Sequence, residues 1–330
     1  MDELLKRINN LSEKEKELFY RIFEIEIEEA QLTLPPAAQK TFDPSVEHQT
    51  IMLIKNKWTG ESISYNAWRS KRPKPKSEDL SVLKDTRDDF EHVHKKMPPD
   101  EFGYLENDFG TTAENIAKVK KYHSLVVFKN PFSQDIGPQD IKGCFNLAET
   151  WFQKADEKTG GFKNGMVLWN SGYRSAATIL HPHFQLIYPA HVSGRSAMLE
   201  QAAHMYQKEC GYSYWDDFKK IHRALGLAKN NGHAEVIIPL VQYKDDELYI
   251  FAKNIEKSTE DLGTIMYAYK KLHENFNMFF YRTCENELPL GFAISRGSSA
   301  QKSSDIGALE LYSFSIVESD PFMFANRFFA

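Results

Sequence analysis

The sequence predicts an α+β fold in which two related halves build antiparallel sheets. In each half, short apolar runs with strand-like alternation stand before and after one amphipathic helix. Strands and helices do not alternate one by one, so a doubly wound parallel sheet is not expected. With 330 residues, of which 42% are hydrophobic and 13% aromatic, the chain can bury a sizeable core. The halves share an order of elements, but their sequences are too different to prove a duplication.

We divide the chain into three segments. Residues 1–36 are expected to form a helical extension, residues 37–195 the first half and residues 196–330 the second half. In the extension, Ser12 and Glu15 form a capping-box pattern, and apolar residues follow at helical spacing. This pattern predicts one or two helices over the first 34 residues, ended by the prolines at 35 and 36.

The two halves contain further elements that can be read from their periodicity. Strands are predicted over residues 50–54, 63–68, 125–128, 166–169 and 184–188, and then over 234–241, 248–252, 278–281 and 291–294. Helices are predicted over residues 139–155, 196–209, 213–226 and 259–276. Residues 73–101 are rich in Pro, Lys and Asp, which predicts a loop.

Composition excludes several classes of protein. The 41 basic and 46 acidic residues give a net charge of −5, which disfavours non-specific nucleic-acid binding. There is no run of about 18 apolar residues, so no membrane span is expected, and the N-terminus lacks the apolar core of a signal peptide. Cys144, Cys210 and Cys284 lie far apart, which excludes a disulfide framework and a Cys-based zinc ribbon. We expect a cytoplasmic protein.

The most informative segment runs from Asn170 to Gln185 and contains His181-Pro182-His183-Phe184-Gln185. In an extended chain, His181, His183 and Gln185 lie on one face, within reach of a single phosphate. A neutral imidazole can attack phosphorus and form a covalent phosphoramidate. An amide N–H of Gln185, or of Asn170, could then stabilise charge on the phosphate oxygens. The spacing alone is also compatible with structural histidines, a metal-binding pair or a solvated surface.

This segment resembles the active-site strand of the galactose-1-phosphate uridylyltransferase group of the histidine-triad superfamily. The group's pattern is an Asn, a nearby Gly, a small-residue bend ending in Ser, and then His-Pro-His-x-Gln; here Thr178 stands where Ser is usual. Upstream, Thr59-Gly60-Glu61 and, after an interval of seven residues, Arg69-Ser70-Lys71-Arg72-Pro73 resemble the group's TGE and RxKRP element. The resemblance covers about residues 43–190. Beyond them only the order of the predicted elements is weakly similar. The resemblance implies two histidine-triad-like halves, the second degenerate.

The resemblance also implies roles for individual residues. His183 matches the nucleophile that takes the nucleoside monophosphate, and Gln185 matches the residue that hydrogen-bonds the phosphate. Arg69 and Arg72 match arginines that bind the substrate's phosphates, a task suited to the planar guanidinium, although a solvated basic loop is the alternative. Further substrate-binding positions are implied along the same segment: Asn170, Ser171, Gly172, Thr178 and His181.

The implied activity is that of a nucleotidylyltransferase, similar to UDP-glucose–hexose-1-phosphate uridylyltransferase, or of a nucleoside-diphosphate-sugar phosphorylase. The partners would be a nucleotide or nucleotide-sugar with a sugar phosphate or phosphate, and a second copy of the chain, since the group often completes its site with the neighbouring subunit. Gln185 cannot shuttle a proton, which favours transfer or phosphorolysis over hydrolysis. A non-catalytic nucleotide-binding relative, or a hydrolase of dinucleoside polyphosphates or nucleotide conjugates, are the alternatives.

The sequence departs from the group's pattern where metals are concerned. The group holds a structural zinc with a CxxC, a further His and the first His of the HPH motif, but the CxxC is missing here and Phe132 stands at the further His position. We therefore expect no cofactor and no metal. Two explanations remain open: a hydrophobic or hydrogen-bonded substitute, or a zinc site built from His92, His94, His123 and His181. A second metal is not expected because residues 291–295 contain no His.

The bend before the HPH motif also departs from the pattern. Ala176 stands where the group prefers Gly, and it would be strained if its φ is positive. Arg174 is bulky for a loop that contacts phosphates. It could serve as a third phosphate ligand or face solvent.

Overall fold

The computed structural model describes residues 2–40, 42–66, 68, 88, 90–161, 164–188, 194–283, 288–301, 304–317 and 320–330. Its centre is a nine-stranded sheet in which every pairing is antiparallel. In spatial order the strands are β4 (Gly110–Glu114), β5 (Tyr122–Phe128), β7 (His183–Tyr188), β6 (Met166–Ser171), β11 (Phe276–Tyr281), β12 (Gly291–Ser295), β10 (Leu248–Ala252), β9 (Ala234–Ile237) and β8 (Ala228–Asn231). The predicted α+β class with antiparallel sheets is confirmed. The strands of the two halves form one continuous sheet, joined where β6 pairs with β11.

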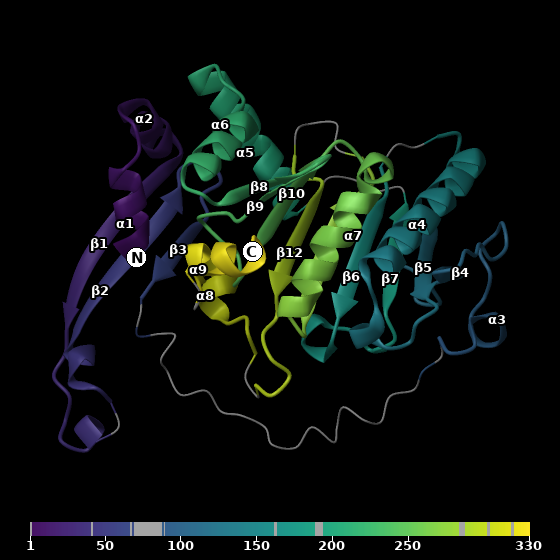
Figure 1. The fold of residues 1–330 in the computed structure, drawn as a ribbon, viewed down its shortest axis with the longest axis horizontal. Helices are drawn as coiled ribbons and strands as arrows, with labels where there is room; N and C mark the ends of the chain where they lie inside the picture. The colour runs from purple at the N-terminus through teal and green to yellow at the C-terminus, as the bar shows by residue number, and fades with distance from the viewer. Residues whose placement is uncertain are drawn as a thin grey trace.

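Two long helices cover one face of this sheet, α4 (Pro138–Thr159) from the first half and α7 (Ile255–Leu272) from the second (Figure 1). Pro138 starts α4 and Gly160, at φ 77°, ends it. The helices approach closely at Gly263, where a Cβ atom would lie 2.7 Å from the carbonyl oxygen of Pro138. Beneath them, the core buries aromatic side chains such as Trp151 and Phe184. The opposite face of the sheet is therefore the one left for a site.

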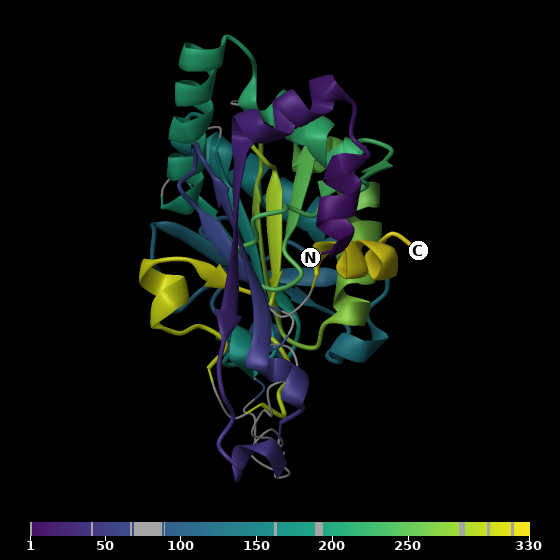
Figure 2. The ribbon, with the colours of Figure 1, turned by 90° about the vertical axis from the view of Figure 1, so that its left-hand side faces the viewer.

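A second sheet contains β1 (Phe23–Gln31), β2 (His48–Asn56), β3 (Ser62–Tyr65) and β13 (Ser315–Ile316), in that order. The ribbon of β1 and β2 projects from the body (Figures 1 and 2). The predicted N-terminal helices are confirmed as α1 (Asp2–Asn9) and α2 (Glu13–Ile22), with Ser12 and Glu15 forming the capping box. The helical prediction is wrong beyond Ile22, because Ile and Glu alternate with period two over residues 24–28 and the segment pairs with β2.

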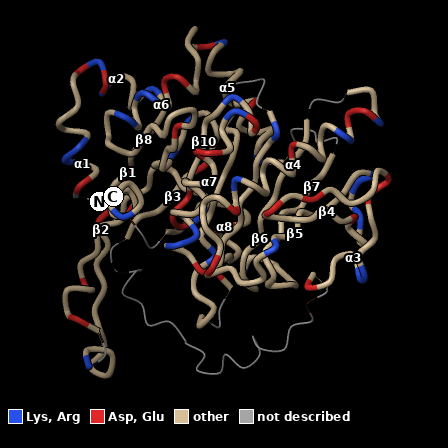
Figure 3. Tube along the Cα trace, turned by 45° about the vertical axis from the view of Figure 1, so that its right-hand side comes forward, with Lys and Arg blue, Asp and Glu red and all other residues tan. Residues whose placement is uncertain are grey.

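The remaining helices are short or lie in the second half: α3 (Val93–Lys96), α5 (Arg195–Cys210), α6 (Tyr214–Ala224), α8 (Ala308–Tyr312) and α9 (Pro321–Phe328). Single 3₁₀ turns occur at Ala38–Lys40, Pro44–Glu47, Ser133–Asp135 and Tyr173–Ser175. Most predicted elements are confirmed to within a few residues, but the helix predicted over 259–276 begins and ends four residues earlier, and α3 lies in the predicted loop. No described helix is long and apolar enough to cross a membrane. Lysines, arginines and acidic residues are spread along the described chain (Figure 3).

Candidate functional site

The HPH segment enters β7, near the middle of the first half's four strands. Because side chains alternate along a strand, Phe184 and Leu186 face the core under α4, and His183 and Gln185 face the other side of the sheet. Gln185 pairs across the ladder with Leu168 on β6. The predicted face is thus the one that the long helices leave uncovered.

His183 is held through its Nδ1, which lies 2.9 Å from the carbonyl oxygen of His181. A carbonyl oxygen only accepts, so Nδ1 carries the proton and the neutral ring has its free lone pair on Nε2. Burial lowers the pKa of His183, which favours this neutral form. The ring of Phe90 packs edge-on at 4.9 Å and shields the imidazole from solvent. Nε2 is therefore the ring nitrogen of His183 that keeps a free lone pair.

His181 uses both ring nitrogens on protein partners. Its Nε2 donates to the carbonyl oxygen of Phe128 at 2.8 Å, and its Nδ1 lies 3.0 Å from Oδ2 of Asp88. These contacts fix the segment whose carbonyl holds His183. They also leave neither nitrogen of His181 free to coordinate a metal.

The open zinc alternative is not supported by the positions of its four histidines. His94 forms an ion pair with Glu106, and His123 contacts Gln185 and Asn115. Among the residues that the structure describes, no three His, Cys, Asp or Glu side chains converge as metal ligands. The described residues therefore do not supply the ligands of the group's structural zinc, and His181 contacts Asp88 and the Phe128 carbonyl oxygen instead.

Gln185 is oriented by His123 on the neighbouring strand β5, whose Nε2 lies 3.4 Å from Oε1 of the glutamine. Since the amide oxygen faces His123, the amide N–H₂ is turned away from it and can donate to a ligand. Burial lowers the pKa of His123.

The bend between β6 and β7 contains two residues with positive φ, and one of them packs closely against the second half. Gly172 has φ 80°, and a Cβ atom there would lie 2.1 Å from Oδ1 of Asn275. Ala176 has φ 66°, so the strain expected from replacing Gly is confirmed. The Ser175 hydroxyl donates to the carbonyl oxygens of Ser171 and Gly172, and Thr178 is exposed. The bend is shaped by its own contacts before any ligand binds.

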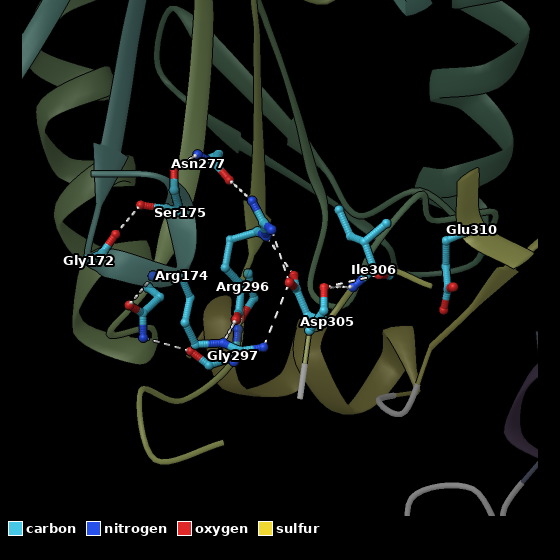
Figure 4. A network of polar contacts seen from close by, with 12 residues as sticks. Gly172, Arg174, Ser175, Asn277, Arg296, Gly297, Asp305, Ile306 and Glu310 are labelled. Atoms are coloured by element: carbon cyan, nitrogen blue, oxygen red, sulfur yellow. Dashed lines mark hydrogen bonds and ion pairs between the residues drawn. The ribbon is translucent and has the colours of Figure 1, made fainter. Parts of the chain in front are cut away.

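A polar network from the second half supports this bend (Figure 4). Asn277 on β11 donates from Nδ2 to Oδ1 of Asn170 at 2.7 Å and to the Ser175 carbonyl oxygen at 2.9 Å. Arg296 donates to Oδ1 of Asn277 at 2.8 Å and pairs through two nitrogens with Asp305. The solvent-facing role considered for Arg174 is wrong: its guanidinium donates to the Arg296 and Gln301 carbonyl oxygens and is largely buried beside Asp305.

The upstream motif is described only in part. Arg69 and Arg72 lie outside the described residues. Glu61, the last residue of the TGE element, pairs with Nε of Arg195 at 2.6 Å, and the same guanidinium pairs with Glu247. Arg195 therefore links this element to Glu247 of the second half. Sequence reasoning did not identify Arg195, Asn277, Arg296 or Asp305, because no local pattern connects them to the bend.

No protein-family model and no curated protein matches the sequence. Solved structures do match the fold. The ADP-glucose phosphorylase of Arabidopsis thaliana, solved with bound ADP-glucose, aligns with a TM-score of 0.61 and 16% identity over 84% of this chain and 98% of the other. A galT-like protein of Arabidopsis thaliana gives 0.57 and 15% over 84% and 98%, and a uridylyltransferase gives 0.56 and 14% over 83% and 96%. The chain has the fold of galT-like proteins, as the motifs predicted.

Proposed function

We propose that the protein is an enzyme that transfers a nucleoside monophosphate through a covalent intermediate on His183. The observation that carries the proposal is the hydrogen bond from Nδ1 of His183 to the His181 carbonyl oxygen, which places the lone pair on Nε2. Gln185 and Asn170, each oriented through its oxygen, lie on the same face of the sheet. Their amide N–H₂ groups are suited to stabilise a phosphate that is under attack.

The reaction has two balanced steps. Nε2 of His183 forms a bond to the α-phosphorus while the bond to the leaving phosphate oxygen breaks, and a sugar phosphate or phosphate departs as an anion. In the second step an oxygen of an acceptor phosphate bonds to the same phosphorus and the N–P bond breaks, which restores neutral His183. Neither step needs a proton carried to or from Gln185, so transfer and phosphorolysis are favoured over hydrolysis.

The proposal also includes the donor, the residues that contact its phosphates and the oligomeric state. One galT-like neighbour is an ADP-glucose phosphorylase and another a uridylyltransferase, which supports a nucleotide sugar as donor. Activity on UDP-glucose with a hexose 1-phosphate is one member of this class. We assign phosphate contacts to Arg69, Arg72, Ser171, Gly172 and Thr178, and we give His181 the task of holding the segment before His183. A homodimer in the cytoplasm completes the proposal.

The test is intact-mass spectrometry after incubation with UDP-, GDP- and ADP-sugars and with dinucleoside polyphosphates. The quench is mildly alkaline because a phosphoramidate is labile in acid. We expect a nucleoside-monophosphate adduct on the wild type and on the exposed control His233→Ala, and none on His183→Ala. The mass of the adduct identifies the base.

Two other results would contradict the proposal. Binding of a nucleotide without an adduct indicates a non-catalytic nucleotide-binding protein. An adduct that persists in His183→Ala indicates another nucleophile. Addition of phosphate, a hexose 1-phosphate or buffer alone to the isolated adduct then distinguishes phosphorolysis, transfer and hydrolysis by the product that each releases.

A further inference from the structure

The ribbon of β1 and β2 projects from the body of the protein, and β1 lies on its outer side (Figures 1 and 2). β1 stands at one end of its four-stranded sheet and pairs with β2 along all nine of its residues. In the part of the chain that the structure describes, no strand pairs with the other edge of β1. An open edge of this length is a template for a further strand.

The hydrogen bonds at the two ends of the ribbon determine which residues of β1 turn their backbone groups outward. Lys57 donates its N–H to the Ile22 carbonyl oxygen at 2.9 Å. Leu32 donates its N–H to the Glu47 carbonyl oxygen, also at 2.9 Å. Both pairs continue the register of β1 and β2, in which hydrogen-bonded and non-hydrogen-bonded pairs alternate. Even-numbered residues of β1 therefore bond to β2, and the odd-numbered residues within 25–31 present N–H and C=O groups at the open edge.

One face of β1 is acidic. Glu24, Glu26 and Glu28 are exposed and share this face because side chains alternate along a strand. Neighbouring members are about 6.8 Å apart along the strand, so their carboxylates repel one another. Lys55 stands opposite Glu24 across the ladder, and apolar residues stand opposite the other two. Among the described residues, no lysine or arginine forms an ion pair with any of the three. A row of cations at the same spacing would relieve this repulsion.

The other face of β1 is apolar at its centre. Ile25 lies opposite Ile54, and Ile27 lies opposite Met52. Both side chains on β2 are completely buried, whereas Ile27, at the edge of the sheet, is 48% exposed. A further strand with apolar side chains on this face would extend the row and remove Ile27 from water.

A second copy of β1 does not suit this edge. The outward backbone groups belong to odd-numbered residues, so two antiparallel copies must place odd-numbered residues opposite one another. In every register that pairs most of the strand, a glutamate of one copy then lies opposite a glutamate of the other. Like charges directly opposite each other are destabilising. The edge therefore favours a strand of opposite charge over a copy of itself.

From these features we infer that the open edge of β1 binds an extended segment of another protein, with basic side chains at every second position and apolar side chains between them. The segment would add an antiparallel strand to the sheet, with its basic side chains opposite the glutamates and its apolar side chains beside Ile25 and Ile27. Its apolar residues would exchange backbone hydrogen bonds with β1, and its basic residues would turn their backbone groups away. This inference uses no residue of the site at His183 and does not rest on the proposed function.

The test measures the Kd of fluorescein-labelled synthetic peptides by fluorescence anisotropy. The reference peptide repeats Lys-Val and has blocked ends. A second peptide carries backbone N-methyl groups on its valines, which removes the N–H groups that would face β1. A third carries them on its lysines, whose N–H groups would face away, and is the matched control. A fourth has the same composition with its lysines contiguous.

We expect the peptide with N-methylated valines to bind at least tenfold more weakly than the reference, and the one with N-methylated lysines to bind within threefold of it. The peptide with contiguous lysines should bind at least fivefold more weakly. Equal Kd values for all four peptides would overturn the inference, because charge alone would then account for the binding. Absence of binding by the reference peptide would overturn it as well. None of these comparisons depends on the folding of a variant.

Two variants of the protein locate the binding to the edge. Ile27→Pro removes one outward N–H and leaves the hydrogen bonds to β2 in place, since Pro is tolerated on an edge strand where its nitrogen faces solvent. It should raise the Kd of the reference peptide at least tenfold, whereas Ile27→Val, which keeps the N–H, should stay within twofold of wild type. Urea midpoints establish that both variants are folded. An unchanged Kd in folded Ile27→Pro would place the peptide elsewhere and overturn the inference.

A charge-matched pair of triple variants tests the acidic face. Replacement of Glu24, Glu26 and Glu28 by Gln should raise the Kd at least fivefold and reduce its dependence on salt. Replacement of three exposed glutamates far from β1 in sequence should change the Kd less than twofold at the same net charge: Glu157, Glu209 and Glu256. Equal effects of the two triple variants would overturn the assignment of the basic side chains to this face.

Sedimentation velocity tests the other occupant. We expect Ile27→Pro and wild type to have the same oligomeric state, because the edge of β1 repels a copy of itself. A concentration-dependent oligomer of the wild type that Ile27→Pro abolishes would overturn the inference and identify a second copy as the strand that pairs with β1.

Discussion

Nδ2 of Asn277 donates to Oδ1 of Asn170 at 2.7 Å, across the junction between the two halves of the sheet. The orientation of Asn277 is fixed because Arg296 donates to its Oδ1. Asn170 in turn receives a donor on its oxygen, which leaves its N–H₂ group for a ligand. A residue of the second half therefore fixes the orientation of a first-half side-chain amide.

The first prediction is that loss of the Asn277 amide, which orients Asn170, slows the reaction. Asn277→Ala should slow adduct formation on His183 by roughly 10- to 100-fold, since small displacements of a positioning group have effects of this size. Asn277→Asp should do the same, because a carboxylate still pairs with Arg296 but cannot donate to Asn170. Single-turnover mass spectrometry measures the rate. The exposed Asn230→Ala, on β8, is the control and should react like wild type. A fully active Asn277→Asp protein would show that Asn170 needs no partner.

The second prediction concerns Gln185. Gln185→Glu keeps the size of the side chain but replaces an N–H₂ donor with a negative charge beside the transferring phosphate. The rate of adduct formation should fall by about 10²- to 10³-fold, the usual cost of losing one donor to a developing oxyanion. Adduct formation is followed at saturating donor, so that weaker binding is separated from slower chemistry. A rate within threefold of wild type would remove Gln185 from the reaction.

The shared face of the HPH segment could be predicted from sequence because it depends only on the spacing of neighbouring residues. His183 and Gln185 stand two positions apart, and the period of a strand alone places them on one face. The strain at Ala176 could also be anticipated, since a residue without glycine's freedom stands in a tight bend. The strand at Phe23–Gln31 was predictable in principle from its alternating Ile and Glu, but the helical spacing of the preceding residues was extended too far.

The supporting contacts could not be predicted because they join distant parts of the chain. Asn277 reaches Asn170 only because β11 pairs with β6, and Asp305 approaches Arg174 through a loop that follows β12. Asp88 reaches His181 from a segment with no regular element of its own. No motif in a single sequence encodes these pairings, since each depends on strand register and on where a loop returns.

The third prediction concerns metal. Coordination of zinc by His181 would break either its contact with Asp88 or its hydrogen bond to the Phe128 carbonyl oxygen. We therefore expect the purified protein to contain less than about one zinc ion per ten chains, and EDTA to leave adduct formation unchanged, since the ring is already braced by protein groups. Elemental analysis by mass spectrometry supplies the first measurement. One zinc per chain, with adduct formation lost in EDTA, would contradict this expectation.

The fourth prediction concerns the effect of the positive φ of Ala176 on stability. Ala176→Gly should stabilise the protein by about 0.5–1 kcal/mol, because the cost of a left-handed alanine exceeds the added freedom of glycine in the unfolded chain. The neighbouring Ala177 is buried and does not have a positive φ, so Ala177→Gly should instead destabilise by about 1 kcal/mol. Urea midpoints at constant slope measure both changes. Destabilisation of equal size in the two variants would mean that the strain at Ala176 is not relieved by glycine.

The last prediction concerns the pH dependence of stability. His222 is completely buried, donates from Nδ1 to the Phe218 carbonyl oxygen at 2.7 Å and accepts the Leu240 N–H on Nε2 at 3.0 Å. Burial lowers the pKa of His222 to about 4. Between pH 6.5 and pH 4 the unfolded chain binds a proton there and the folded chain does not, so the folded state loses stability as the pH falls. The loss reaches about 3 kcal/mol at most.

His222→Gln isolates this contribution, because Gln can donate and accept but does not titrate. The variant should be less stable than wild type at pH 7, and the difference should narrow as the pH falls toward 4. The comparison is needed because other groups titrate in the same range: burial lowers the pKa of His273 to about 4, and burial raises the pKa of Asp100 to about 6, with the opposite effect on stability. Free energies of unfolding in urea at several pH values measure the difference. A constant gap between the two proteins would mean that His222 titrates alike in the folded and unfolded states.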